Sequence, residues 1–157
     1  ELHTGRRHPD GTVTPRGVSG YLDAPNRPLY AFGYGLTYTS FAYSEASLSS
    51  ETMTKEEILT AKITVQNTGN RAGTEVVQIY IRDVAGSVAR PVRELKGFQR
   101  IVLQPGESRE VTFEITEEML RFYNIDMEYV AEPGRFEVYI GGNSDAEQKA
   151  EFRLVQM

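Results

Sequence analysis

The sequence of 157 residues contains no cysteine and no tryptophan. The absence of cysteine excludes disulfide bonds and thiolate metal sites, and it leaves the redox compartment open. No run of about 18 apolar residues exists, so no segment predicts a transmembrane helix. Positive charge is also scarce, because 17 Lys and Arg face 22 Asp and Glu. The net charge of −5 argues against nucleic acid or an anionic membrane surface as a partner.

The first 40 residues differ in composition from the rest of the chain. They hold 6 of the 14 glycines and 4 of the 7 prolines, and their apolar residues do not alternate with polar ones. Such a long stretch without regular structure is unusual inside a compact domain, so residues 1–40 predict a linker or an arm laid over another domain. The chain begins with Glu1 rather than Met, and we expect it to be a piece of a longer polypeptide.

Aromatic residues are concentrated at the end of this arm. Residues 28–44 read PLYAFGYGLTYTSFAYS and carry six aromatic side chains, with Gly33 and Gly35 between them. Disordered segments are poor in aromatics, so the run is expected to cover a surface. Tyrosines suit burial against a partner domain, and exposed tyrosines that stack on sugar rings are the alternative.

From residue 41 onward, apolar residues alternate with polar ones, which is the pattern of strands buried on one face. We expect strands over 59–66, 77–82, 94–103, 111–115 and 136–140, with edge strands near 43–48 and 151–155. Turn signals such as Gln104-Pro105-Gly106-Glu107 separate them. One helical turn is expected over 116–122, capped by Thr116. About seven short strands predict an all-β fold, an antiparallel β-sandwich over residues 41–157.

No convincing reactive centre is present. Glu110, Glu114 and Glu137 occupy the polar positions of predicted strands, where a solvated face explains them better than a pair of catalytic carboxylates. The two histidines, His3 and His8, lie in the arm, which offers no rigid scaffold for a base or a metal ligand. We expect no catalytic residue, no metal and no cofactor in this chain.

A basic cluster lies around the start of the strand expected over 94–103. It consists of Arg90, Arg93, Lys96 and Arg100. Such a cluster could bind anions or hydroxyls at the rim of a sugar site. Lys and Arg on an edge strand also prevent unwanted pairing with other sheets, and this structural explanation is preferred.

The residues match a known pattern at several points. Residues 28–39, PLYAFGYGLTYT, resemble the PLFPFGYGLSYT signature of bacterial β-glucosidases of glycoside hydrolase family 3. The resemblance continues in order through Asn67-Thr68-Gly69, Val77-Gln78-Ile79-Tyr80, Leu95-Lys96-Gly97-Phe98 and Glu132-Pro133-Gly134. Ala31 and Arg7 replace prolines of the family pattern. The resemblance implies the C-terminal domain of those enzymes, an immunoglobulin/fibronectin type III-like β-sandwich with an extended N-terminal arm.

The resemblance also implies a role. The domain would be non-catalytic, and it would stabilise and dock upstream catalytic domains that hydrolyse β-glucosides or β-xylosides with retention of configuration. Neither catalytic motif of the family has a matching position here, so the fragment alone is not expected to be an enzyme. The family suggests a periplasmic or extracellular location. The residues expected to dock the upstream domains are Tyr30, Phe32, Gly33, Tyr34, Gly35, Leu36 and Tyr38.

Two alternatives stay open. The chain would be a carbohydrate-binding module if exposed aromatic rings lay in a row on the sandwich, and Tyr80 and Tyr139 are the candidates for sugar contact. It would be a free-standing adhesion or protein-binding domain if the native polypeptide were short.

Overall fold

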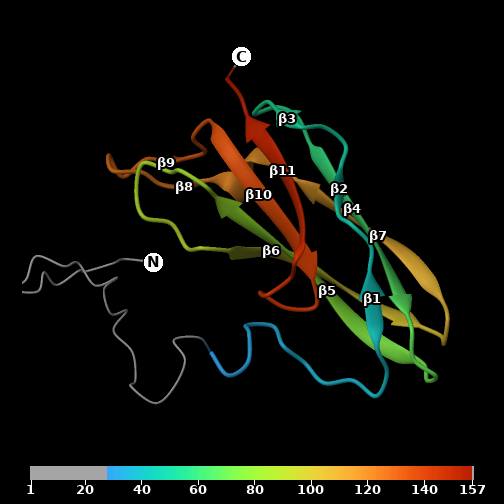
Figure 1. The fold of residues 1–157 in the computed structure, drawn as a ribbon. Coiled ribbons are helices and arrows are strands. Elements are labelled where there is room, and N and C mark those ends of the chain that lie inside the picture. The colour runs from blue at the N-terminus through green and yellow to red at the C-terminus, as the bar shows by residue number, and fades with distance from the viewer. Residues whose placement is uncertain (1–27, 157) are drawn as a thin grey trace, which may run out of the picture. The chain divides into compact units, whose positions relative to one another are not determined.

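The computed structural model describes residues 28–156 (Figure 1). The chain forms two compact units, Glu1–Tyr30 and Ala31–Met157. Residues 31–40, which the sequence places in the arm, therefore belong to the same unit as the strands. Among the described residues, no helix is long and apolar enough to cross a membrane.

The second unit contains two main sheets and a small hairpin (Figure 1). In the smaller sheet, the central strand β4 pairs antiparallel with β1 and β2 on one edge and with β7 on the other. The larger sheet has the order β3-β11-β10-β5-β6, and only its β3–β11 pair is parallel. The strands of the smaller sheet are β1 (Phe41–Tyr43), β2 (Ser47–Leu48), β4 (Leu59–Asn67) and β7 (Ser108–Ile115). Those of the larger sheet are β3 (Thr52–Met53), β5 (Gly73–Asp83), β6 (Glu94–Leu103), β10 (Gly134–Gly141) and β11 (Gln148–Leu154), and β8 (Phe122–Tyr123) pairs with β9 (Tyr129–Val130) in the hairpin.

The predicted all-β fold is confirmed, and most of the expected strands are present. The edge strand expected near 43–48 is instead two short strands, β1 and β2, with residues 44–46 between them. The sequence pattern missed β3, β8 and β9, which are two residues long and too short to show an alternation. The expected helical turn is a 3-10 helix, η1 (Glu117–Leu120). The prediction that the Thr116 side chain caps it is wrong, since that side chain makes no capping hydrogen bond and only the Thr116 carbonyl accepts, from the Met119 amide at 3.1 Å.

One apolar core lies between the two sheets. The inward residues of β4, β5, β7, β10 and β11 form a single cluster, so the sheets pack face to face as a sandwich. In β4, Ala61, Ile63 and Val65 are at most 2% exposed and alternate with polar residues, as expected. Each buried aliphatic or aromatic side chain contributes about 1.5–3 kcal/mol, which lets the fold form without disulfides.

The larger sheet is buried on both faces near its centre. Residues 77–81 of β5 and 136–141 of β10 are all buried. The expectation that Glu137 lies on a solvated face is therefore wrong, because it is 5% exposed and forms ion pairs with Arg82 (3.2 Å) and Lys149 (3.3 Å). Glu110 and Glu114 are exposed, as expected.

The carboxamide of Asn67, at the end of β4, joins four parts of the chain. Asn67 is fully buried, and its Nδ2 donates hydrogen bonds to the carbonyls of Arg71 (2.7 Å) and Leu103 (3.0 Å). Its Oδ1 accepts from the Thr39 hydroxyl (2.6 Å) and the Gly69 amide (3.0 Å). One side chain thus fixes the end of the arm, the turn after β4 and the end of β6.

We expect Asn67→Ala to lower the free energy of unfolding by about 1–3 kcal/mol or more, because it leaves buried carbonyl and amide groups without partners. Urea denaturation of the purified chain measures this. Gln66→Ala is the matched control, since it removes an amide from the exposed face of the same strand, and it should change the free energy by less than about 0.5 kcal/mol. Equal effects of the two substitutions would contradict the role of Asn67.

Candidate functional site

The arm segment of the second unit begins with a tight turn. The Tyr34 amide donates to the Ala31 carbonyl at 3.0 Å, and Gly33 at the third position has φ +79°. This is the geometry of a type II turn, which favours glycine there. A Cβ on Gly33 would collide with Oε1 of Gln78. The expectation that Gly33 permits both a turn and a close approach is confirmed.

Gly35 behaves differently from Gly33. A Cβ added to Gly35 would meet nothing within 4 Å, and its φ lies outside the left-handed region. Gly35 therefore avoids no clash with the described residues, and its expected part in docking stays a prediction. Tyr30 ends the first unit, so the arm segment of the sandwich starts at Ala31.

Main-chain oxygens of the arm hold the turn on the outer face of the larger sheet. Gln78 Nε2 on β5 donates to the carbonyls of Gly33 (3.1 Å) and Gly142 (2.6 Å), and the Ser144 amide donates to the Phe32 carbonyl (2.8 Å). The Tyr80 hydroxyl donates to Gln78 Oε1 at 2.5 Å. The bonds that reach the arm are accepted by its backbone carbonyls at Phe32 and Gly33.

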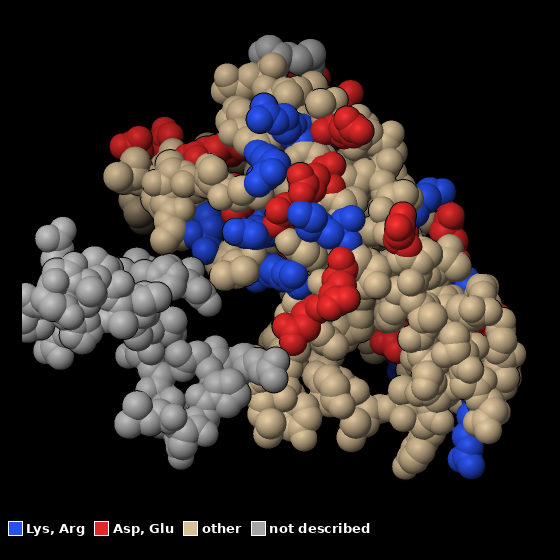
Figure 2. Space-filling view, viewed as in Figure 1, with Lys and Arg blue, Asp and Glu red and all other residues tan. Residues whose placement is uncertain are grey.

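The side chains of the arm are turned outward. Leu36 and Tyr38 are 90% and 92% exposed, and Phe32 and Tyr34 are 66% and 48% exposed. Residues 28–44 carry no charged side chain. In Figure 2 charges of both signs alternate over the larger sheet, whereas the part of this face along which the arm runs is mostly uncharged. The arm is thus an ordered backbone that presents an apolar surface.

A groove of about 380 Å³ separates the arm from β5. Tyr34 and Leu36 line one side of it, and Val76 lines the other. Tyr43 and Glu75 also line it. Burial raises the pKa of Glu75, and burial together with the nearby Glu75 carboxylate raises the pKa of the Tyr43 phenol above its usual range.

The tyrosines considered for sugar contact are buried. Tyr80 is 1% exposed and Tyr139 is 7% exposed, because the arm turn and the segment before β6 cover the outer face of the sheet. The Arg93 guanidinium lies 3.6 Å from the centre of the Tyr139 ring, and the Tyr139 hydroxyl donates to Glu137 at 2.7 Å. The expectation of exposed rings at these positions is wrong, and neither ring is open to stack on a sugar.

The basic residues of the 90–100 region bind mainly to groups of the sandwich. Arg93 donates to the carbonyls of Ser144 (2.6 Å) and Ala146 (2.9 Å). Arg90 and Lys96 each form an ion pair with Glu94, at 3.2 Å and 2.9 Å. Arg100 alone of the four is exposed. The structural explanation of this cluster is therefore better supported than an anion site.

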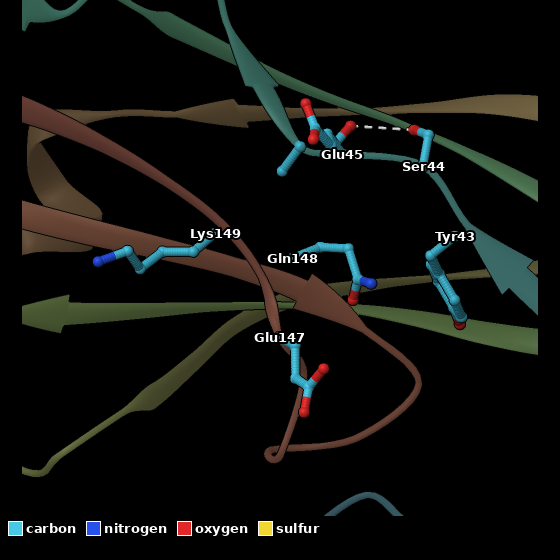
Figure 3. Close-up of a pocket in the computed structure, with 7 residues that line it drawn as sticks. Tyr43, Ser44, Glu45, Glu147, Gln148 and Lys149 are labelled. Carbon is cyan, nitrogen blue, oxygen red and sulfur yellow. Dashed lines mark hydrogen bonds between the residues drawn. The ribbon is translucent and has the colours of Figure 1, made fainter.

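A second hollow, between β1 and the start of β11, does not resemble a glycosidase site. Its volume is about 480 Å³, and residues 43–46 and 147–149 line it (Figure 3). Its two carboxylates, Glu45 and Glu147, are exposed, and in Figure 3 they lie on opposite sides and point away from each other. Within residues 28–156, no group of three or more His, Asp or Glu side chains is arranged to hold a metal ion.

Sequence reasoning missed the residues that hold the arm. Gln78 and Ser144 occur in segments that the sequence assigned to a strand and a turn, with no sign of a distant partner. The only signal was the short Val77-Gln78-Ile79-Tyr80 motif, whose polar members were placed on a solvated face.

We expect Gly33→Ala to loosen the arm turn by about 1–3 kcal/mol, because alanine is strained at φ +79° and its Cβ collides with Gln78. Hydrogen exchange of the Tyr34 and Ser144 amides should accelerate about tenfold or more. Gly35→Ala is the matched control and should leave both exchange rates unchanged. If the two variants behaved alike, the assigned role of Gly33 would be wrong.

A second expectation concerns pH. Burial raises the pKa of Glu75, so the folded chain holds this proton to a higher pH than the unfolded chain. The stability linked to the protonated carboxyl is present below the ordinary glutamate pKa and is lost as the pH rises through the raised value. Glu75→Gln should therefore unfold at higher urea concentration than the wild type at about pH 8, and the difference should vanish near about pH 4. Glu56→Gln, at an exposed carboxylate, should show no such pH-dependent difference.

Comparisons with known proteins agree with this architecture. Residues 75–144 match the family described as fibronectin type III-like domain. The chain is 47% identical over 155 residues to a periplasmic β-glucosidase of Salmonella typhimurium, covering 98% of this chain and 20% of that protein. It is 50% identical over 135 residues to a putative β-xylosidase of Formosa agariphila, covering 86% and 18%. The structure of a β-glucosidase from Listeria innocua in complex with glucose superimposes with a TM-score of 0.83 at 42% identity, covering 98% of this chain and 21% of that one.

The chain spans about a fifth of the length of the relatives that it matches. The matched regions include both the arm motif and the β-sandwich, because two of these comparisons cover 98% of the chain. The chain belongs to the fibronectin type III-like domains of glycoside hydrolase family 3.

Proposed function

We propose that this chain is a non-catalytic accessory domain that docks onto catalytic domains preceding it in the same polypeptide and stabilises them. One observation carries the proposal. The backbone of residues 32–33 is fixed to the larger sheet by hydrogen bonds, while Phe32, Leu36 and Tyr38 turn outward on a segment that has no charge. An ordered, uncharged and exposed aromatic surface is typical of an interface whose partner is absent.

The energetics of this surface favour docking within one polypeptide. Burial of the four outward side chains of residues 32–38 would contribute about 1.5–3 kcal/mol each before costs. Because the hydrogen bonds already hold the turn, little of this gain is spent on ordering it. A covalent connection also keeps the partner at high effective concentration.

The names of the relatives support the nature of the partner. Those relatives are β-glucosidases and β-xylosidases, and they are about five times as long as the matched region. We infer that the upstream domains of this polypeptide hydrolyse β-glucosides or β-xylosides and carry the catalytic residues. The Salmonella relative is named as periplasmic, which supports a periplasmic or extracellular location for this protein.

The two alternatives receive less support. The carbohydrate-binding hypothesis needed exposed rings at Tyr80 and Tyr139, and both rings are buried. The hypothesis of a free-standing domain needs a short native polypeptide, whereas each relative named above extends far beyond the matched region.

An antibody against this chain should therefore detect, in extracts of the source cells, a polypeptide about five times heavier than 17.7 kDa. A band near 17.7 kDa without a precursor would contradict the proposal.

The docking itself is tested in the full-length polypeptide. We expect the double substitution Leu36→Ser and Tyr38→Ser to accelerate thermal inactivation of the glycosidase activity about tenfold or more, because the interface loses two apolar side chains. The matched control is Tyr123→Ser with Ile125→Ser, which removes a similar apolar area from the exposed β8–β9 hairpin. Equal inactivation rates for wild type and arm variant would count against docking through the arm.

A further inference from the structure

The exposed apolar surface does not end at the arm. On the outer face of the larger sheet, Val76, Phe98 and Val102 are 37%, 66% and 52% exposed. Val76 lies on β5, and the other two lie on β6, the last strand of the sheet. Exposed large apolar residues on an edge strand are a liability in an isolated domain, so their presence here requires an explanation.

Strand register places these residues beside the arm. Phe98 is the antiparallel partner of Gln78, and Val102 is the partner of Thr74, so their side chains lie on the same face as the Gln78 carboxamide. That carboxamide is the group on which the Gly33 turn rests. Phe98 therefore lies one strand spacing from the anchored turn, and Val76 faces Tyr34 and Leu36 across the groove.

The sandwich itself does not need these side chains. The alternate residues of β6, Ile101 and Leu103, point inward and are buried in the core. Gly97 also faces inward, toward Ile79 and Phe113. At the start of β6, Leu95 packs against the buried Tyr80 cluster. Among the described residues, Phe98 and Val102 belong to neither apolar cluster, so these two outer positions remain to be covered.

Charge adds a second feature to this face. Arg100 on β6 lies opposite Val76 on β5 in the antiparallel register. It lies between Phe98 and Val102 on the outer face of the strand. Lys96, two residues before Phe98, is paired with Glu94 at 2.9 Å, whereas Arg100 makes no ion pair in the part of the chain that the structure describes. An arginine surrounded by apolar side chains is typical of the centre of a protein interface.

We propose that the docking surface for the upstream catalytic domains extends from the arm across β5 and β6, with Phe98 as its apolar anchor and Arg100 paired with a carboxylate of those domains. This inference rests on the proposed function and specifies its contact surface. The occupant follows from continuity, because the β6 face adjoins the arm and the relatives carry about four fifths of their length outside the matched region. A partner tethered through the arm reaches this face first.

Hydroxyl-radical footprinting of the native full-length polypeptide tests the inference. Phe98 and Tyr123 have similar exposure in this chain, 66% and 60%, so they serve as test and reference. If the upstream domains cover β6, Phe98 and Phe32 should both be oxidised about fivefold more slowly than Tyr123. Labelling of Phe98 at the rate of Tyr123, with Phe32 still protected, would overturn this inference and leave the proposed function intact.

The remaining outcomes are also distinct. Labelling of both phenylalanines at the reference rate would overturn the proposed function together with this inference. Protection of Phe98 that disappears on dilution would indicate a second copy of the chain as the occupant and would equally overturn the inference.

Substitutions in the full-length polypeptide provide an independent test. Phe98→Ser and Arg100→Glu should each accelerate thermal inactivation of the glycosidase activity about fivefold or more, since one removes the anchor and the other reverses the charge facing the carboxylate. Tyr123→Ser is the matched control for Phe98→Ser and should leave the rate unchanged. Wild-type rates for both β6 variants would overturn the inference.

Discussion

The placement of the arm depends on the carboxamide of Gln78. This side chain is 5% exposed on the outer face of β5, and it donates to two carbonyls that belong to distant segments, at Gly33 and Gly142. A buried amide is costly unless it is fully hydrogen-bonded, so the sheet, the arm and the β10–β11 connection must be in place together. Gly33 is required by the same contact, because any side chain there would occupy the position of the Gln78 oxygen.

A second buried amide fixes the other end of the arm segment. Asn67 accepts from Thr39 and donates to Leu103, which joins the arm to the ends of β4 and β6. Residues 33–39 are therefore held at both ends by buried side chains of the sandwich. This explains how a stretch rich in glycine and aromatics stays ordered although its side chains contribute little to the core. The arm is pre-organised, and that reduces the entropy lost when a partner covers it.

The sequence predicted the fold well and the site only in part. Alternation in β4 and β7 was sufficient, since one face of each strand packs on the core and the other meets solvent. The same rule failed on the outer face of the larger sheet. The polar residues there are buried because segments far away in the sequence cover this face, and they are Gln78, Tyr80, Glu137 and Tyr139. The arm turn that covers Gln78 lies 45 residues earlier, and local periodicity carries no information on such a contact. Sequence reasoning predicted the same role for Gly33 and Gly35, and only the structure separates them, because Gly33 alone of the two has a positive φ and a close neighbour, Gln78.

The burial of the outer face also separates the tasks of the aromatic residues. The hydroxyls of Tyr80 and Tyr139 donate hydrogen bonds, and Arg93 covers the Tyr139 ring. Both tyrosines therefore stabilise the layer of side chains on the outer face of the larger sheet. Phe32, Tyr34 and Phe98 remain at the surface of that layer. A domain evolved only for its own stability gains nothing from exposed aromatic side chains on this face, and it incurs a risk of aggregation. The cost is offset if the same residues are covered in the complete polypeptide, where that layer of side chains becomes the middle of an interface between domains.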